Sequence, residues 1–218
     1  MRLFPLIILI FSSRISFSQS TLKDSIAHDV CHCLSVKNDI SQKDIEDCFQ
    51  YALATNSKSI RRLVSNPDGS LSKEAIDTFM QTCLTDLSIS MIYSCETYFK
   101  FMDSSRFTDY RDINKDSITG VIKKLTADTS MAKNKDFFNQ RGELYFKISD
   151  LKNALADFDS ALKLDPTIEE SLRFKAWILE LEKNYDDALK IYNKLASTTG
   201  NINYEILIAI TSKKKNGL

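Results

Sequence analysis

The chain has 218 residues, of which 43% are hydrophobic, and it carries 29 basic and 29 acidic side chains. This length suits one large or two small domains, and five Gly with three Pro are too few for the many tight turns of an all-β protein. The balanced charge argues against a nucleic-acid partner, because phosphate-backbone binders carry clustered Lys and Arg.

The N-terminal segment, positions 1–18, has the layout of a secretory signal peptide. Arg2 precedes the apolar run Leu3–Phe11, and Ser16 and Ser18 stand at the two positions that signal peptidase reads. We therefore expect cleavage after Ser18 and an exported protein, periplasmic or extracellular. A membrane span needs about 20 apolar residues, so we expect none in the mature chain; the alternative is an uncleaved N-terminal anchor.

Residues 19–102 are predicted to form a helical, disulfide-bearing domain. Ser41 with Asp44 predicts a capping box at the start of the second helix. The third helical stretch, which begins near Ser72, is compatible with one long helix or with a break near Ser88–Ser90. Apolar residues recur at helical spacing at Leu22, Ile26, Val30, Cys33 and Leu34, at Ile45, Cys48, Phe49 and Ala52, and at Ile76, Phe79, Met80, Cys83, Leu84, Leu87, Met91, Cys95 and Phe99.

The five cysteines are Cys31, Cys33, Cys48, Cys83 and Cys95, and all lie in this domain. In an oxidising compartment they are expected to form disulfides, with one thiol left over because five is odd. Neighbouring helices would bring Cys33 beside Cys48, closing a loop of about 15 residues worth roughly 3 kcal/mol. Either Cys83 or Cys95 would then pair with Cys31, and the connectivity stays open.

Two histidines allow a different interpretation of the same segment. His28 and His32 flank Cys31 on one helix, so these three side chains are candidate metal ligands. The Cys31-His32-Cys33 run is also a candidate redox site, although its spacing differs from Cys-x-x-Cys. A metal- or redox-active domain is therefore an alternative to a purely structural one.

Residues 103–131 are predicted to be a linker followed by a short helix. Ser, Asp, Arg and Thr dominate from Asp103 to Asn114, and the helical spacing of apolar residues is lost there. It returns at Ile118, Val121, Ile122 and Leu125, which would pack on the start of the next region.

Residues 132–218 contain a pattern that occurs twice with the same internal spacing. The first copy is Phe138, Gly142, Tyr145, Ala154, Phe158, Ala161 and Pro166, and the second is Leu172, Ala176, Leu179, Ala188, Tyr192, Leu195 and Gly200. This spacing resembles the tetratricopeptide repeat (TPR), a pair of helices in a unit of about 34 residues. Thr167 with Glu170 predicts a capping box for the second copy, and Asn203–Lys213 is predicted to be a capping helix. The Cys-x-Cys helix followed by such repeats resembles exported bacterial proteins.

The resemblance implies an all-α protein whose short α-solenoid binds a protein or peptide in a groove. Groove-facing positions would come from the first helix of each hairpin: Asn139, Glu143, Phe146, Arg173, Trp177 and Glu180. Trp177, the sole Trp, is a candidate hot spot; alternatively it packs under the capping helix. Members of the family bind a C-terminal carboxylate with Lys and Asn side chains, and Glu143 stands at a position where that binding needs an uncharged amide. Binding of a C-terminal carboxylate in the family's manner is therefore not expected.

No nucleophile elbow, phosphate-binding Gly loop or His-Glu-x-x-His motif occurs in the sequence. We therefore expect a non-enzymatic protein without a cofactor, acting as an exported scaffold for protein–protein interactions. The alternatives are the metal- or redox-active domain carried on a repeat stalk, and a structural protein, including a homodimer.

Overall fold

The computed structural model describes residues 6–66, 68–79, 83–107, 110, 113–128 and 134–217, with side chains from residue 20 onward. Within those residues the chain is helical and has no strand beyond one isolated bridge between Ser65 and Leu71. The predicted all-α class is therefore confirmed. The chain divides into two compact units, Met1–Met102 and Asp103–Leu218, and each is described by itself.

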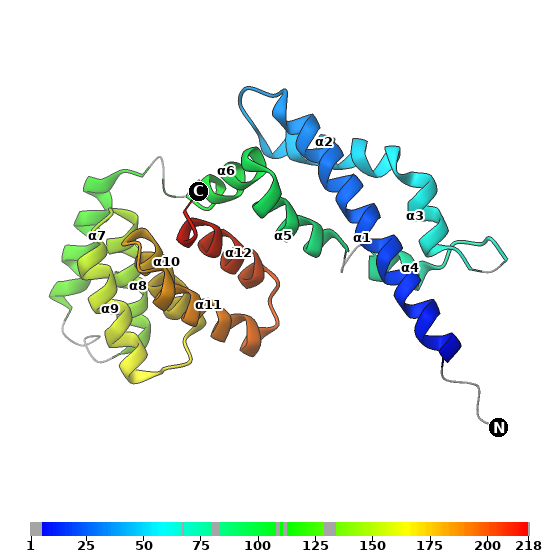
Figure 1. Cartoon of the computed structure of the whole chain (residues 1–218). Helices are drawn as coiled ribbons and strands as arrows, with labels where there is room; N and C mark the ends of the chain where they lie inside the picture. The colour runs from blue at the N-terminus through cyan, green and yellow to red at the C-terminus, as the bar shows by residue number, and fades with distance from the viewer. Residues whose placement is uncertain are drawn as a thin grey trace. The chain divides into compact units, whose positions relative to one another are not determined.

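The first unit holds six helices among its described residues, and the final residues of the sixth, 103–105, belong to the second unit. None of the described helices is long and apolar enough to cross a membrane. The predicted cleavage point, Ser18, lies within the first helix. The helices are α1 (Leu6–Ser35), α2 (Gln42–Thr55), α3 (Ser57–Val64), α4 (Lys73–Thr78), α5 (Leu84–Ser94) and α6 (Glu96–Ser105) (Figure 1).

The apolar stripe of α1 forms the core of this unit together with α2 and α5. Ile26, Val30 and Leu34 are completely buried, as are Leu87 and Met91 on α5. Burial of such side chains is worth about 1.5–3 kcal/mol each relative to exposure. Packing thus follows the spacing seen in the sequence.

Two disulfides connect α1 to the rest of the unit. Cys33 pairs with Cys48 on α2, which confirms that expectation, and Cys31 pairs with Cys95. Of the two partners considered for Cys31, the structure therefore selects Cys95. Cys83 is free and buried, and burial raises the pKa of its thiol, so this side chain stays protonated at neutral pH.

Local signals mark some of the helix boundaries. The capping box is confirmed: Ser41 Oγ accepts from the backbone N–H of Asp44, and the Asp44 carboxylate accepts from that of Ser41. The third helical stretch breaks, but at Cys95 rather than near Ser88–Ser90, because the Cys95 backbone is extended (φ −123°, ψ 102°).

The second unit repeats its helices at a constant interval. Adding 34 to the bounds of α8 (135–147) yields those of α10 (169–181), and adding 34 again yields those of α12 (203–215). The second helices of the two hairpins obey the same rule, since they begin at positions 151 and 185. The helices are α7 (Lys115–Ala127), α8 (Lys135–Lys147), α9 (Leu151–Leu164), α10 (Glu169–Leu181), α11 (Tyr185–Thr199) and α12 (Asn203–Lys215) (Figure 1).

The turns inside the two hairpins also match. Ser149 and Lys183, which are separated by the same interval, are the non-glycine residues with positive φ (67° and 63°) among the described part of the chain. The N–H of the following residue donates to the carbonyl of Tyr145 in one turn and of Leu179 in the other. A left-handed residue that ends a helix satisfies carbonyls that the helix leaves open. The repeat therefore extends to backbone hydrogen bonding.

Close approach within the first hairpin depends on Gly142. A Cβ built on this glycine would lie 2.9 Å from the ring of Phe158, so a side chain would collide with α9. In the second hairpin Ala176 and Tyr192 take these two positions, and both are buried. A small residue opposite an aromatic ring thus holds each pair of helices together.

The predicted capping box of the second copy is wrong. α10 is preceded by Ile168, and no side chain caps it. The hydroxyl of Thr167 instead donates to the carboxylate of Asp165, 2.6 Å away. Thr167 therefore stands one residue before the N-cap, and both its backbone N–H and its hydroxyl donate to Asp165.

Candidate functional site

The face formed by α8, α10 and α12, here called the first-helix face, carries the six predicted binding residues. Phe146, Trp177 and Glu180 are buried, with 6%, 6% and 3% of their surface exposed. Asn139, Glu143 and Arg173 are partly exposed. Half of the predicted set is therefore covered by other parts of the chain.

The covering side chains come from Asp103–Phe107 and Tyr110. The ring of Phe107 lies 5.2 Å from that of Trp177, and the ring of Tyr110 lies 5.4 Å from that of Phe146 and 5.6 Å from that of Trp177. Such separations are typical of packed aromatic pairs. The part of the predicted linker that the structure describes is therefore a packed element of the second unit.

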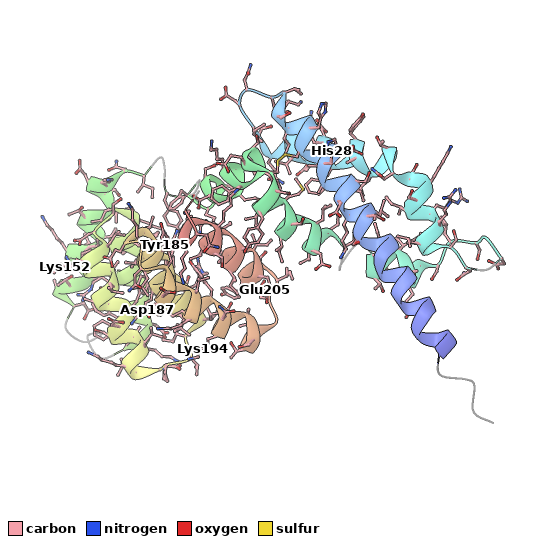
Figure 2. The ribbon with its side chains drawn as sticks, viewed as in Figure 1. His28, Lys152, Tyr185, Asp187, Lys194 and Glu205 are labelled. Carbon is pink, nitrogen blue, oxygen red and sulfur yellow. A yellow bond between two sulfur atoms is a disulfide. The ribbon has the colours of Figure 1, made fainter. Side chains whose placement is uncertain are left out.

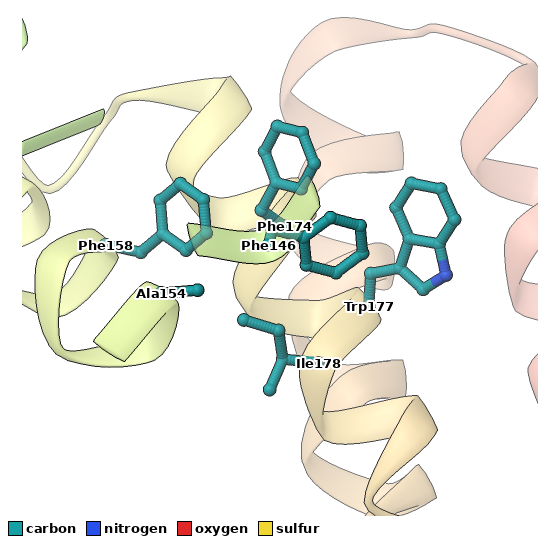
Figure 3. Close-up of a cluster of buried hydrophobic side chains, with 6 residues drawn as sticks. All are labelled: Phe146, Ala154, Phe158, Phe174, Trp177 and Ile178. Carbon is teal, nitrogen blue, oxygen red and sulfur yellow. The ribbon is translucent and has the colours of Figure 1, made fainter. Parts of the chain in front are cut away.

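Beneath these rings lies the core of the unit. Figure 3 shows Phe146, Phe158, Phe174 and Trp177 side by side, with Ala154 and Ile178 next to them. The rings of Phe158 and Phe174 are parallel, with centroids 5.1 Å apart. Trp177 was alternatively expected to pack under the capping helix; it is buried, but its aromatic partners are Phe107, Tyr110, Phe146 and Phe174.

Glu180 is the centre of a buried ionic network. Its carboxylate accepts two hydrogen bonds from the Arg106 guanidinium, at 3.0 and 2.7 Å, and one from Lys214 Nζ at 2.9 Å. Asp103 pairs with both cations, so two carboxylates balance two positive charges. Paired in this way, a buried carboxylate keeps its charge, whereas an unpaired one would be strongly disfavoured.

The pKa values within the network follow from burial and pairing. Burial alone would raise the pKa of Glu180, but hydrogen bonding and charge attraction from Arg106 and Lys214 outweigh it, and the pKa lies below its ordinary value. Burial, followed by the nearby negative charge of Glu180, raises the pKa of Tyr192. Glu180 is thus ionised and Tyr192 neutral at physiological pH.

The three partly exposed predicted residues have local partners. Asn139 donates to Glu170 at 2.7 Å and accepts from Ser171 at 2.6 Å, so it connects α8 to α10. Glu143 pairs with Lys147 one turn along its helix. Arg173 lies over the ring of Phe174, 4.4 Å from the centroid, and 3.7 Å from the Glu170 carboxylate.

A pocket of about 230 Å³ remains open on the first-helix face. Two predicted residues, Arg173 and Trp177, lie in its wall. Its lining is Arg106, Tyr110, Arg173, Trp177, Tyr192 and Leu207. The pocket thus lies beside the part of the face that Arg106, Phe107 and Tyr110 cover.

The candidate metal ligands are only partly available. His28, labelled in Figure 2, lies on the surface of α1 and its ring is 6.4 Å from that of His32. Cys31, however, is held in the disulfide with Cys95 and has no thiolate to offer. No group of three or more potential metal ligands is found among the described residues.

A larger cavity of about 410 Å³ lies in the first unit, beside the free thiol. Lys23 and Cys83 stand in its wall, together with apolar residues of α3 and α4. Sequence reasoning did not indicate this cavity. The pattern of apolar residues indicates which side chains turn inward, but not where packing leaves space.

Sequence reasoning also missed Arg106, Phe107, Tyr110, Leu207 and Lys214 as parts of the face. One signal was present: Glu180 lies one helical turn from Trp177 and Ala176, and an acid buried beside such residues requires a basic partner. The sequence offers many Arg and Lys residues and does not single out Arg106, which is 74 positions away. No family model, no curated protein and no solved structure matches this chain.

Proposed function

We propose that the second unit is a TPR-type module of an exported protein, and that it binds a protein segment at the open pocket of the first-helix face. The observation that carries this proposal is the pocket itself. It is bounded by Arg173, Trp177 and Leu207, which come from the first helices of successive repeats, and an Arg and a Trp in a concave, part-apolar wall are typical of binding hot spots.

The volume of the pocket limits the size of the group that it can bind. Small-molecule sites usually enclose about 300–1,000 Å³, whereas this pocket has about 230 Å³. A single side chain of a partner fits this volume better than a cofactor does. We therefore propose recognition of one anchoring side chain by the pocket, not of an extended peptide along the whole face.

The two disulfides support the proposal that the protein is exported. Two disulfides in the first unit are typical of proteins that fold in an oxidising compartment, and the sequence begins with the predicted signal peptide. The metal- or redox-active alternative has less support, because Cys31 and Cys33 are each paired with a distant cysteine.

A peptide-display selection on the immobilised chain from Gln19 onward tests this function. Selected peptides would be synthesised, and their affinities measured by titration. Arg173→Ala is expected to weaken binding about tenfold, in line with a hot-spot residue. Lys194→Ala is the control, because Lys194 is exposed on α11 and does not line the pocket (Figure 2).

Equal affinity of the wild type and Arg173→Ala for every selected peptide would contradict the proposal. So would a selection that enriches no peptide.

A further inference from the structure

Two imidazoles lie on the exposed face of α1, one helical turn apart. His28 and His32 are both exposed, and 79% of the side-chain surface of His28 is accessible (Figure 2). The two rings are nearly parallel, at 15°, and their centroids are 6.4 Å apart. Residues four apart are neighbours on a helix surface, and the paired histidines of helical zinc sites have the same spacing. Both rings therefore border the same region of solvent beside α1.

The backbone that carries these rings is held in place. On the opposite face of α1, Ile26 and Val30 are completely buried. Cys31 and Cys33, the two neighbours of His32 in the sequence, each form a disulfide with a distant cysteine. Ligands on a backbone that is already fixed lose less conformational entropy on binding than ligands on a flexible segment. The fold thus preorganises the two imidazoles.

A carboxylate orients one of the two rings. Asp29 Oδ1 lies 3.6 Å from His28 Nδ1, and Asp29 Oδ2 accepts a hydrogen bond from Asn56 Nδ2 at 2.9 Å. Asn56 ends α2 and also donates to the carbonyl of Ala52, so it holds the carboxylate from outside α1. A carboxylate beside one ring nitrogen favours the proton there and leaves the other nitrogen, Nε2, free for a metal ion. Asp29 is therefore a positioning residue.

The charges on α1 around the pair favour a cation. No Lys or Arg occurs between Lys23 and Lys37, whereas Asp24 and Asp29 lie in this interval. Both of these lysines are paired with an acid from another part of the first unit. Neutral imidazole binds ions such as Cu²⁺, Ni²⁺ and Zn²⁺, whereas Mg²⁺ and Ca²⁺ prefer oxygen ligands. The chemistry of the pair therefore selects a transition-metal ion.

We propose that His28 and His32 chelate one divalent transition-metal ion, and that Cu²⁺ binds most tightly among the first-row ions. His28 contributes Nε2, because its Nδ1 faces Asp29. The site does not need Cys31, which is held in a disulfide, and it is independent of the pocket in the second unit. Two protein ligands leave the other coordination positions to water, so the ion is exchangeable, unlike the ion of a closed structural site.

Titration calorimetry tests the site on the oxidised chain from Gln19 onward, without a histidine tag, with Cu²⁺, Zn²⁺ and Mg²⁺ as probes. Cu²⁺ should bind with one equivalent per chain and a dissociation constant on the order of 10 μM. Zn²⁺ should bind more weakly, and Mg²⁺ should not bind. Electron paramagnetic resonance of the Cu²⁺ complex should show two nitrogen ligands. One ion per two chains would overturn the proposal, since the site would then be shared between copies.

Two variants separate chelation from other binding. His32→Gln should weaken Cu²⁺ binding about a hundredfold, because a single imidazole loses the gain from two linked ligands, and the resonance spectrum should lose one nitrogen. His32 is exposed, so the far-UV circular dichroism should stay that of the wild type. Cys83→Ala should leave the affinity unchanged, since the free thiol of Cys83 is buried and takes no part.

Asp29→Asn tests the orientation of His28. It keeps an acceptor for Asn56 but loses the charge beside Nδ1, and removal of a group that orients a metal-binding histidine typically costs about tenfold or more in affinity. Asp24→Asn is the matched control, because Asp24 is exposed one turn before His28 and the change of charge is the same. It should weaken binding much less.

Wild-type affinity of His32→Gln for Cu²⁺ would overturn the proposal, and so would binding of Mg²⁺ as tight as that of Cu²⁺. Equal losses for Asp29→Asn and Asp24→Asn would overturn the orienting role of Asp29. Binding of selected peptides by the second unit is measured separately, so failure of one proposal is distinguishable from failure of the other.

Discussion

The helices of the two units are held against one another by different interactions. In the first unit, disulfides connect α1 with α2 and with Cys95. In the second unit no cysteine occurs in the sequence, and α8–α12 repeat one packing arrangement at a constant interval along the chain. An irregular helical unit can therefore depend on covalent connections, whereas repeated contacts between neighbouring hairpins do not need them.

Reduction of the disulfides should produce the largest difference between the units. The chain-entropy estimate is about 3 kcal/mol for the loop between Cys33 and Cys48 and about 4 kcal/mol for that between Cys31 and Cys95, with sequence separations of 15 and 64. Urea unfolding with dithiothreitol, followed by far-UV circular dichroism, should show the first unit unfolding at much lower urea.

Trp177 provides the internal control, because it is the sole Trp and lies in the second unit. Its emission should report the same midpoint with and without dithiothreitol. A large fall of that midpoint on reduction would contradict the claim that the second unit is stable without the disulfides of the first unit.

Removal of the buried charge at Glu180 should be the most damaging single change in the second unit. Glu180→Gln leaves Arg106 buried with one carboxylate fewer, and disruption of a buried ion pair typically costs about 3–5 kcal/mol. Urea unfolding followed by Trp177 emission measures this loss. Glu182→Gln is the matched control, since Glu182 is exposed at the end of the same helix.

The same carboxylate predicts a dependence on pH. Because pairing holds the pKa of Glu180 below its ordinary value, its stabilisation is fully present above the unfolded-state value of about 4.3 and is lost as pH falls through the folded value. Acidification should therefore lower the urea midpoint of the wild type more than that of Glu180→Gln. Parallel pH profiles would show that Glu180 is not stabilised by its partners.

Gly142 tests how closely the repeated helices must approach. Gly142→Ala places a methyl group against the Phe158 ring, which should cost about 1–3 kcal/mol, less about 1 kcal/mol gained in helix propensity. Thermal unfolding should show a net loss of about 1 kcal/mol. Gly120→Ala is the control: no atom lies within 4 Å of a Cβ there, so this variant should be stabilised, and an equal gain for both would contradict close packing at Gly142.

The turn residues should produce the smallest effect. Lys183 has a positive φ of 63°, which costs a residue with a side chain about 1–2 kcal/mol, whereas glycine loses roughly 0.5–1 kcal/mol of chain entropy there. Lys183→Gly should therefore stabilise the second unit by up to about 1 kcal/mol in urea unfolding. Lys194→Gly, inside α11, should destabilise it by about 1 kcal/mol, and the opposite order would contradict the assignment of the turn.

Several features of the fold were predictable because they are encoded locally. The capping box of Ser41 and Asp44 and the small residue at Gly142 each depend on a few neighbours in sequence. The proximity of Cys33 to Cys48 follows from two adjacent helices joined by a short loop. The candidate site was predictable only in part: Arg173 and Trp177 line the pocket, but Phe146 and Glu180 are buried.

The sequence by itself determined the all-α class and the register of the repeated helices, because helix formation and hairpin packing depend on residues close together in the chain. Only the tertiary structure decided that Cys31 pairs with Cys95 and that Arg106 reaches Glu180, across sequence separations of 64 and 74. The physical reason is that the sequence offers several chemically equivalent partners: more than one cysteine could form a disulfide with Cys31, and more than one Arg or Lys could form an ion pair with Glu180. Which one does so depends on where packing places it. The same dependence on packing explains why Arg106, Phe107 and Tyr110 cover part of the first-helix face and leave a pocket open beside Trp177.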